Sequence, residues 1–304
     1  MQCIYINLDE AEARREAVER TFRENCPASW TLERLPAFDR AYVEQAKIPG
    51  TLSAGEKACF LSHLRALESS MESDGPVLIA EDDVELGPAT AGVLDDVIRR
   101  LPPEAWDLLY TEVDVWGIGV HRMIDLWTLH QLLTIQRQFK IVNLRTIPFA
   151  GATCYVVNER SKQKVVDALR THSPLRTPVD LLLQHLILRR ELHGSVVYPF
   201  VTSISAESSC SQIQTPDASD GRMLRTAVRR GMWVGCDRAA VEQAIDAIDL
   251  GSYDPQTLFQ AKILRSIALE MLSGLIMESA DRERDHSAGE AAIGAGPDGS
   301  SSLK

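Results

Sequence analysis

A short apolar stretch that runs directly into three acidic residues constrains the fold of this chain more than any other feature. Residues 77–80 read VLIA and are followed at once by the acids Glu81, Asp82 and Asp83. Asp74-Gly75-Pro76 precedes the stretch, and an apolar run bounded by turn residues predicts a buried strand. Three adjacent carboxylates repel one another, so this strand must end close to positive charge.

Strand-like and helix-like segments alternate along the rest of the chain. The opening run at 3–8 (CIYINL) predicts a buried strand, and residues 9–25 predict an amphipathic helix with its acids near the N-terminus. Ser53 and Glu56 form a capping-box pattern, so a second helix is expected to begin there and to continue to about Ser70. This alternation is typical of an α/β fold.

The remaining segments extend the same pattern. Further helices are expected at 88–100, 159–171 and from Pro178 onward, and further extended segments at 106–112, 151–158 and 194–205. Residues 113–147 fit either a lid or an inserted helix. Two more amphipathic helices are expected at 238–249 and 255–277. Residues 279–304 are rich in Gly, Ser and Asp and predict a disordered tail.

Charge and composition exclude several classes of protein. The chain of 304 residues has 32 Lys and Arg against 43 Asp and Glu, a net charge of −11, which argues against a nucleic-acid-binding protein. No secretory signal and no apolar run of about 18 residues is present, so we expect a cytoplasmic protein that contacts membranes at most peripherally. Reduced, buried thiols are expected at Cys3, Cys26, Cys59, Cys154, Cys210 and Cys236.

The acids at the end of the apolar strand predict a ligand site. Side chains alternate along a strand, so Glu81 and Asp83 are expected on one face and Asp82 on the other. In open α/β sheets, ligands bind at the carboxyl ends of strands. A hard divalent cation between these carboxylates and a diphosphate would balance their charge. A solvated acidic turn and the aspartate of a phosphoryl-transfer enzyme remain alternatives.

The order of segments along the chain resembles glycosyltransferase family 25, the bacterial lipooligosaccharide galactosyltransferases and their relatives. The matching segments cover about residues 2–213 and read YINLD with an arginine pair shortly after, LSAGEKACFLSH, VLIAEDDVEL, GATCYVV and PVD. The resemblance implies a GT-A type fold, that is, a Rossmann-like mixed sheet flanked by helices. We therefore divide the chain into a catalytic domain at 1–215, a helical C-terminal extension at 220–278 and the tail.

The resemblance also implies an activity and its site residues. A sugar, galactose by default, would move from a UDP-sugar to a cell-surface glycan with inversion at the anomeric carbon. The donor site would contain Asn7, Arg14, Glu56, Ser62 and His63. Asp83 would bind Mn²⁺ or Mg²⁺, with Asp82 as a second candidate ligand, and Glu81 would bind a ribose or sugar hydroxyl.

An inverting transfer also needs a general base, for which we choose Asp180. It lies in the first turn of the helix after Pro178, where backbone N–H groups would keep its carboxylate ionised. The reserve candidates are Glu112, Asp114 and Glu207, and a third metal ligand could come from His185 or His193. Departures from the family pattern lie at Glu10, Ala58 and Phe38-Asp39-Arg40, and they leave open a divergent or inactive member.

An arginine-rich stretch follows the catalytic domain, with basic side chains at Arg222, Arg225, Arg229 and Arg230. They predict either contact with an anionic membrane that carries a lipid-linked acceptor, or pairing within the molecule. Two other functions remain open: a metal-dependent phosphoryl or nucleotidyl transferase, and a sugar-nucleotide-binding relative without activity. The sequence has no G-x-x-x-x-G-K-[ST] motif, which disfavours the first of them.

Overall fold

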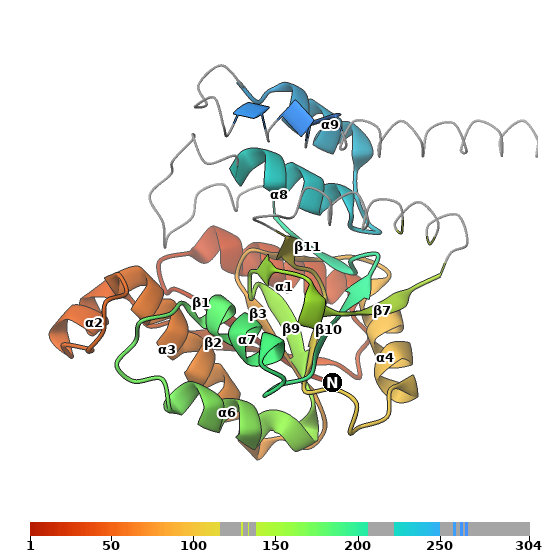
Figure 1. Ribbon diagram of the computed structural model, residues 1–304. Helices are drawn as coiled ribbons and strands as arrows, with labels where there is room; N and C mark the ends of the chain where they lie inside the picture. Colours follow the sequence, from red (N-terminus) through yellow and green to blue (C-terminus); the bar gives the residue numbers. More distant parts are fainter. Residues whose placement is uncertain are drawn as a thin grey trace, which may run out of the picture.

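A seven-stranded sheet forms the centre of the computed structural model (Figure 1), in the order β2-β1-β3-β9-β5-β10-β7. The structure describes residues 1–115, 129, 133, 138–205, 222–249, 258–259, 262–263 and 265–266. The strands of this sheet are β1 (Gln2–Asn7), β2 (Thr31–Pro36), β3 (Val77–Glu81), β5 (Leu108–Tyr110), β7 (Lys140–Asn143), β9 (Cys154–Val157) and β10 (Gly194–Tyr198).

Helices and two small strand pairs surround this sheet. The helices are α1 (Glu12–Asn25), α2 (Arg40–Gln45), α3 (Ala54–Ser69), α4 (Thr90–Arg100), α6 (Lys162–Arg170), α7 (Val179–Leu188), α8 (Arg222–Gly231) and α9 (Arg238–Asp246). The two strand pairs are β4 (Val84–Leu86) with β11 (Thr202–Ile204), and β6 (Asp114–Val115) with β8 (Phe149–Ala150). The mixed α/β fold expected from the sequence is confirmed.

Strand direction places the carboxyl ends of five strands at one edge of the sheet. β1 is parallel to β2 and to β3, and β9 is antiparallel to both β3 and β5. Because β9 is antiparallel to both of its neighbours, β5 runs in the same direction as β3. β10 is parallel to β5. The carboxyl ends of β1, β2, β3, β5 and β10 therefore meet at the same edge, where the acids after β3 lie.

Both faces of the sheet are buried, which is why its central strands are apolar throughout. Ile4 and Ile79 belong to the larger hydrophobic cluster, with side chains of α3, α6 and α7. Tyr5 and Leu78, one residue away along each strand, belong to the second cluster, with side chains of α1 and α4. The two-residue period of a strand thus sends alternate side chains into two separate cores.

Most of the expected elements are present to within a few residues, and several short elements were missed. The capping box is present, since the Ser53 side chain accepts from the Glu56 N–H and the Glu56 carboxylate accepts from the Ser53 N–H. β2, β4, β8 and α2 were not predicted. Of the segment at 113–147, the structure shows β6 and β7, while most of its residues lie outside the described ones. The helix expected at 255–277 lies largely outside them, and the tail at 279–304 entirely.

The helices α8 and α9 pack onto the same core as the sheet. Val228 and Trp233 belong to the larger hydrophobic cluster. The Phe200 N–H donates to the Met232 carbonyl at 3.1 Å, and the Val234 N–H donates to the Phe200 carbonyl at 2.9 Å. Figure 1 shows both helices above the edge of the sheet at which β11 lies. The domain boundary predicted at 215–220 falls outside the described residues.

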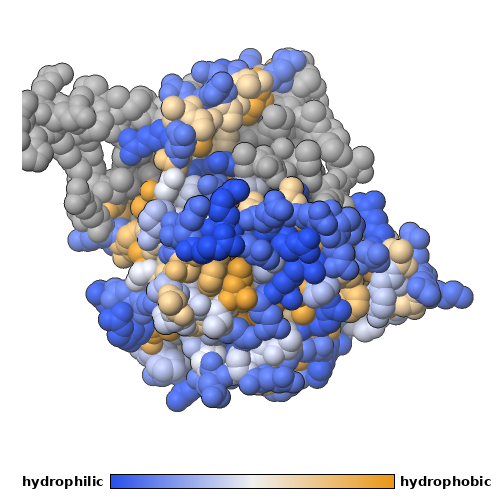
Figure 2. All heavy atoms as spheres, turned by 180° about the vertical axis from the view of Figure 1, so that it is seen from behind, coloured by the Kyte–Doolittle hydropathy of each residue, from blue (hydrophilic) through white to orange (hydrophobic). Residues whose placement is uncertain are grey.

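Hydrophilic side chains cover most of the face of the protein shown in Figure 2, with smaller hydrophobic areas between them. None of the helices in the described ranges has the length and apolar composition to span a membrane.

Free thiols are present at Cys3, Cys26, Cys59, Cys154 and Cys236, as expected, whereas Cys210 lies outside the described residues. Only Cys3 and Cys154 are fully buried, so the prediction of burial is wrong for the other three.

Candidate functional site

The three acids after β3, hereafter the acidic turn (Glu81–Asp83), point in different directions. Glu81 is the last residue of β3, and Asp82 and Asp83 form the turn that leads into β4. Glu81 faces α3, whereas Asp82 faces α1 and the end of β1. The opposite directions expected for Glu81 and Asp82 are therefore present, although the strand ends before Asp82.

Asp82 is held by two residues that the sequence assigned to the donor site. Asn7 Nδ2 donates to its Oδ2 at 2.8 Å, and Arg14 Nη1 donates to its Oδ1 at 3.0 Å. Burial raises the pKa of Asp82 despite these two donors. Of the adjacent arginines, Arg14 points into the molecule, while Arg15 lies 3.7 Å from the exposed Glu12. The structure thus brings Asn7, Arg14 and Asp82 together.

Glu81 contacts the imidazole of His63, a second expected donor-site residue. His63 Nε2 lies 3.0 Å from Glu81 Oε1, and His63 Nδ1 lies 3.1 Å from the hydroxyl of Tyr155. Burial acts to raise the pKa of Glu81. The hydrogen bond and the electrostatic interaction with His63, together with the charges of Arg229 and Arg14, outweigh it, so that this pKa is lowered. Glu81 is therefore held ionised between β3 and α3.

Asp83 is the member of the acidic turn that the chain satisfies least. Its Oδ1 is buried and has no hydrogen-bond partner among the described residues. Burial and the charge of Glu81 raise the pKa of Asp83 to about 7, although the charge of Arg14 acts in the opposite direction. A buried carboxylate oxygen without a donor is costly, and a divalent cation is the partner that such an oxygen accepts best. The residues present fit a hard cation at this place.

A pocket of about 590 Å³ opens in front of the acidic turn. Its walls come from residues 37–41, from α3 and from the start of α1, and all three acids line it. Ser62 shapes one wall, because its hydroxyl donates to the Ala58 carbonyl at 2.8 Å and accepts from the Phe38 N–H at 2.9 Å. A pocket of this volume is in the range of small-molecule sites.

Some pocket residues were missed by the sequence analysis, and two expected donor-site residues, Asn7 and Glu56, do not line the pocket. Asp39, Arg40 and Cys59 line the pocket, although the sequence gave them no role there. The sequence offered only indirect signals for these three residues. Asp39 and Arg40 lie where residues 38–40 depart from the family pattern, and Cys59 is one helical turn from His63. Glu56 does not line the pocket. Its carboxylate accepts from the Ser53 hydroxyl at 2.7 Å, so the structure assigns it to the helix cap.

The predicted base lies beside the pocket rather than in its lining. Asp180 is in the first turn of α7, as expected, and its Oδ2 accepts from the Gly151 N–H at 3.0 Å. It is half-buried, and its charge contributes to raising the pKa of Cys59. His185 and His193 are exposed and do not line the pocket, so the structure gives no support to a third metal ligand from them.

Of the reserve bases, Glu112 is excluded by its contacts. It is fully buried, and both its oxygens accept from the Arg229 guanidinium of α8. Burial raises the pKa of Glu112, against the charge of Arg229. Arg229 Nη2 also donates to Thr153 Oγ1 at 3.2 Å, and the Thr153 carbonyl accepts from the Glu81 N–H at 2.7 Å. Asp114 lies 3.8 Å from Arg225, and Glu207 is outside the described residues.

Three arginines of α8 pair within the molecule, which is one of the two alternatives expected for this stretch. Besides the pairs of Arg229 and Arg225, Arg230 lies 3.7 Å from Glu85 and donates to the Ile204 carbonyl at 3.2 Å. The side chains of these three arginines are 11–30% exposed, so they are turned towards the body of the protein. The side chain of Arg222 lies outside the described residues.

Comparisons with known proteins identify the family of this site. Two solved structures of the glycosyltransferase GlyE from Streptococcus pneumoniae TIGR4, one of them the apo-form, are similar at 11% identity and a TM-score of 0.35. The match covers 64% of this chain and 44% of the GlyE chain, so this chain spans less than half the length of that protein. No curated protein matches the chain. The family model described as "Glycosyltransferase family 25 (LPS biosynthesis protein)" matches residues 1–183, more than half of the sequence, and the chain therefore belongs to glycosyltransferase family 25.

Proposed function

We propose that this protein transfers a sugar from a nucleotide-sugar to a glycan acceptor, with a divalent cation held at the acidic turn. The observation that carries the proposal is the pocket at the carboxyl edge of the sheet. There Asn7 and Arg14 fix Asp82, and Asp83 presents a buried oxygen without a donor among the described residues. In GT-A type enzymes a D-x-D motif binds the metal ion and the donor. In a member of family 25, this arrangement supports the same role for the acidic turn.

The residues of the site would divide the work of binding the donor. Asp83, with Asp82 beside it, would hold Mn²⁺ or Mg²⁺, since both ions prefer carboxylate oxygens. The ion would neutralise the charge that develops on the leaving diphosphate. Arg14 lines the pocket and supplies a fixed positive charge at the same place. Glu81 remains the proposed ligand of a ribose or sugar hydroxyl.

Asp180 remains our proposed general base. The Gly151 N–H fixes one of its oxygens, which leaves the other able to accept the proton of an acceptor hydroxyl. With Glu112 fully occupied by Arg229, no reserve base among the described residues is better placed. Asp180→Asn is expected to lower kcat by roughly 10²–10⁴-fold and to leave donor affinity unchanged. Near-normal turnover of this variant would contradict the assignment.

UDP-galactose as the donor, lipooligosaccharide as the acceptor, inversion of configuration and a cytoplasmic location stay part of the proposal. The test is a transfer assay in which UDP-, GDP- and CMP-sugars are offered with and without Mn²⁺ or Mg²⁺. We expect turnover, or slow donor hydrolysis without acceptor, with a UDP-sugar and metal. Donor binding without either reaction would instead identify a sugar-nucleotide-binding relative. The anomeric configuration of the product, read by NMR, decides inversion.

A further inference from the structure

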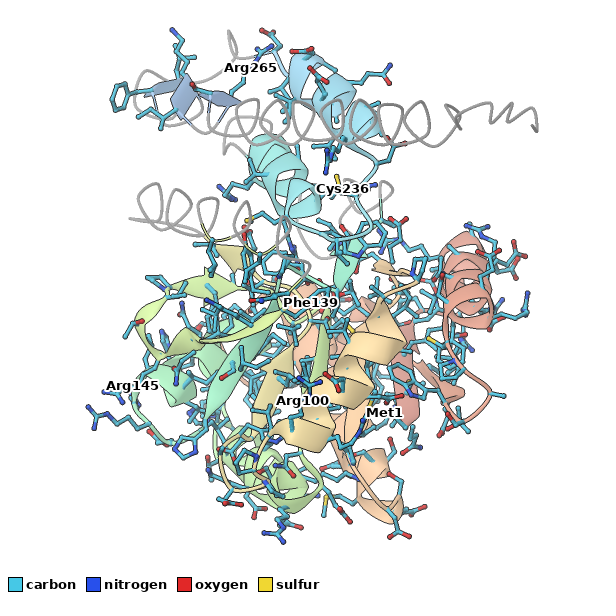
Figure 3. All side chains as sticks on the ribbon, turned by 90° about the vertical axis from the view of Figure 1, so that its right-hand side faces the viewer. Met1, Arg100, Phe139, Arg145, Cys236 and Arg265 are labelled. Carbon is cyan, nitrogen blue, oxygen red and sulfur yellow. The ribbon has the colours of Figure 1, made fainter. Side chains whose placement is uncertain are left out.

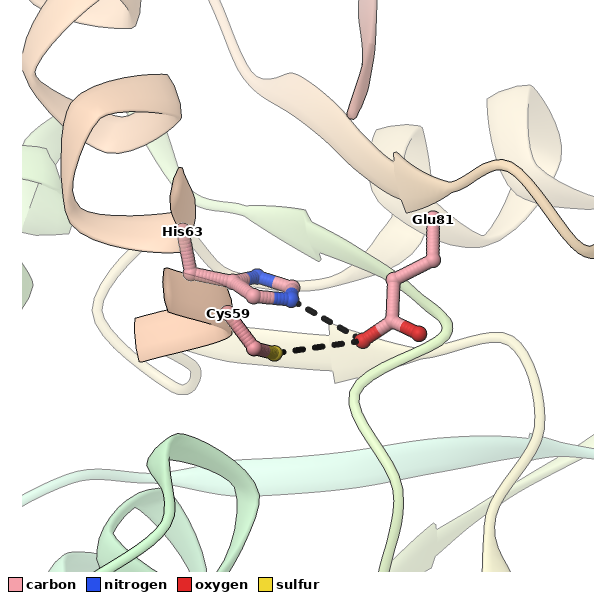
Figure 4. A group of neighbouring side chains, drawn as sticks. All are labelled: Cys59, His63 and Glu81. Carbon is pink, nitrogen blue, oxygen red and sulfur yellow. Dashed lines mark hydrogen bonds and ion pairs between the residues drawn. The ribbon is translucent and has the colours of Figure 1, made fainter. Parts of the chain in front are cut away.

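Two side chains of α3 join Glu81 in the lining of the pocket and form a group unlike the carboxylates of Asp82 and Asp83. Cys59 and His63 are four residues apart on α3 and therefore lie on the same face of the helix. Figure 4 shows both of them pointing at the carboxylate of Glu81. Cys59 Sγ lies 4.0 Å and His63 Nε2 3.0 Å from the same oxygen, Glu81 Oε1. The three donor atoms all lie within 4.8 Å of one another.

We propose that Cys59, His63 and Glu81 form a binding site for a thiophilic divalent cation, with Zn²⁺ as its ligand. Bonds of about 2.0–2.3 Å to a tetrahedral zinc ion place donor atoms roughly 3.3–3.8 Å apart. The observed 3.0 Å and 4.0 Å to Glu81 Oε1 lie on either side of this range, and the sulfur and the imidazole nitrogen, which lie within 4.8 Å of each other, approach by at most about 1 Å when they bind the same ion. Thiolate and imidazole select zinc, whereas the carboxylates of Asp82 and Asp83 suit Mg²⁺ or Mn²⁺.

The surroundings of His63 are those of a metal ligand. A ligating histidine presents one ring nitrogen to the ion and donates its other N–H to a fixed acceptor. His63 is fully buried, and its Nδ1 lies 3.1 Å from the Tyr155 hydroxyl, which can accept that N–H. In the metal-free protein the N–H lies on Nε2 and faces Glu81, so the ion binds the other neutral tautomer, with the N–H on Nδ1 towards Tyr155 and the Nε2 lone pair towards the ion. The ring orientation that zinc requires is thus already fixed by the fold.

The ion can reach the site from the pocket, and its coordination shell can be completed there. All three side chains line the 590 Å³ pocket, so a fourth ligand, water or an oxygen of a bound molecule, can come from that side. The side chain of Glu81 is 26% exposed and faces the opening. Binding exchanges the S–H bond of Cys59 for an S–Zn bond and releases one proton to solvent, with no change of oxidation state.

Zinc at this place would inhibit sugar transfer, because it would occupy Glu81 and one end of the donor pocket. That consequence rests on the proposed function, whereas the binding itself does not. The test therefore measures binding directly. Co²⁺ accepts the same ligands as zinc, and a cobalt–thiolate bond gives an intense charge-transfer absorption in the near ultraviolet.

The experiment titrates the metal-free full-length protein with Co²⁺. We expect the thiolate band to appear, to be abolished by Zn²⁺ and to persist in excess Mg²⁺. Cys59→Ser, a near-isosteric change at a half-buried position, should remove the band and weaken zinc binding by on the order of tenfold or more in a chelator competition. Glu81→Gln should weaken zinc binding but keep the band, since the thiolate remains.

Cys236→Ser is the matched control. This half-buried thiol lies next to α8 in the upper part of the molecule (Figure 3), remote from the pocket, and its loss should leave the band intact. A wild-type protein without a thiolate band, or a band that survives in Cys59→Ser, would overturn the proposal. If the band behaves as expected while no sugar transfer is found in any condition, the zinc site stands and the proposed function fails.

Discussion

The acidic turn and the acids beneath α8 lie close to the same edge of the sheet, but they are neutralised to different degrees. Glu112 is matched by the buried guanidinium of Arg229, and Glu85 and Asp114 have arginine partners from the same helix. In the acidic turn, Asp82 has Arg14, whereas Asp83 keeps a buried oxygen without a donor among the described residues. One region is electrostatically complete, and the other is suited to a cation from solution.

The degree of neutralisation distinguishes structural acids from functional ones. A carboxylate whose oxygens are all engaged by the chain can neither accept a proton nor bind a metal ion without first breaking a contact. A carboxylate that the fold buries but leaves unpartnered costs stability, and such a cost is typical of functional sites. The variants below test this contrast.

The largest effect is expected from breaking the pair beneath α8. Arg229→Met leaves the charge of Glu112 buried and unpaired, so the free energy of unfolding should fall by about 3–5 kcal/mol. Replacing Glu112 by Leu in the same chain removes the stranded charge and should restore most of that loss. Urea denaturation at constant m-value measures both. A single variant that costs less than about 1 kcal/mol would show that the pair is solvated rather than buried.

The opposite pattern is expected at the acidic turn. Asp83→Asn should lower kcat/KM at least about 100-fold, because a cation that stabilises the leaving diphosphate contributes several kcal/mol. Its stability should be unchanged or higher, since the substitution removes a buried charge beside Glu81. Asp96→Asn on α4, at a half-buried position paired with the exposed Arg99 and Arg100, is the control and should change neither quantity. Loss of stability together with activity in Asp83→Asn would make Asp83 structural.

A third acid gives the scale for a purely structural carboxylate. Asp107, before β5 and far from the pocket, accepts from Lys164 at 2.7 Å, from the Ser161 hydroxyl at 2.6 Å and from the His193 N–H at 2.7 Å. Burial acts to raise the pKa of Asp107, but these donors outweigh it and lower the pKa. Its ionised form therefore stabilises the folded state above the pKa of the unfolded chain, about 3.9, and loses this effect as the pH falls through the lower folded value.

Asp107→Asn should accordingly lower the free energy of unfolding by roughly 1.5–3 kcal/mol at neutral pH. The difference from the wild type should shrink as the pH falls from about 4 through the lower folded pKa of Asp107, below which the residue is uncharged in both proteins. Urea denaturation at a series of pH values measures it. A difference that does not depend on pH would mean that the charge of Asp107 is irrelevant.

The smallest effect is expected at Glu56, where family pattern and structure disagree. Because its carboxylate closes the capping box of α3, Glu56→Ala should cost on the order of 1 kcal/mol of stability. The KM for the donor should stay unchanged, since Glu56 does not line the pocket. A large rise in KM at wild-type stability would return Glu56 to the donor site.

The sequence was informative where one periodic pattern decided the outcome. Apolar runs such as 77–80 predicted buried strands, and Ser53 with Glu56 predicted the start of α3. β2 was missed because its residues alternate in exposure at one edge of the sheet, with charged Glu33 and Arg34 among them. Local pattern is weak there, and pairing with β1 supplies the stability.

The candidate site was predictable only where its residues are adjacent along the chain or part of a family motif. The acidic turn, Asn7, Arg14 and His63 were found in this way. The role of Arg229 was not, because α8 follows the region that the family model matches and its partner Glu112 lies 117 residues earlier. The convergence of Cys59 with Glu81 depends equally on how α3 packs beside β3, which no local signal reports.

Metal-dependent nucleotide binding is the decisive test of the proposed cation site at the acidic turn. Unfolding temperature should be measured for the wild type and for Asp83→Asn with UDP, with Mn²⁺, and with both together. Our account predicts a rise for the wild type that requires both ligands and is absent in Asp83→Asn. Equal stabilisation of the two proteins, or stabilisation by UDP that does not depend on Mn²⁺, would contradict it.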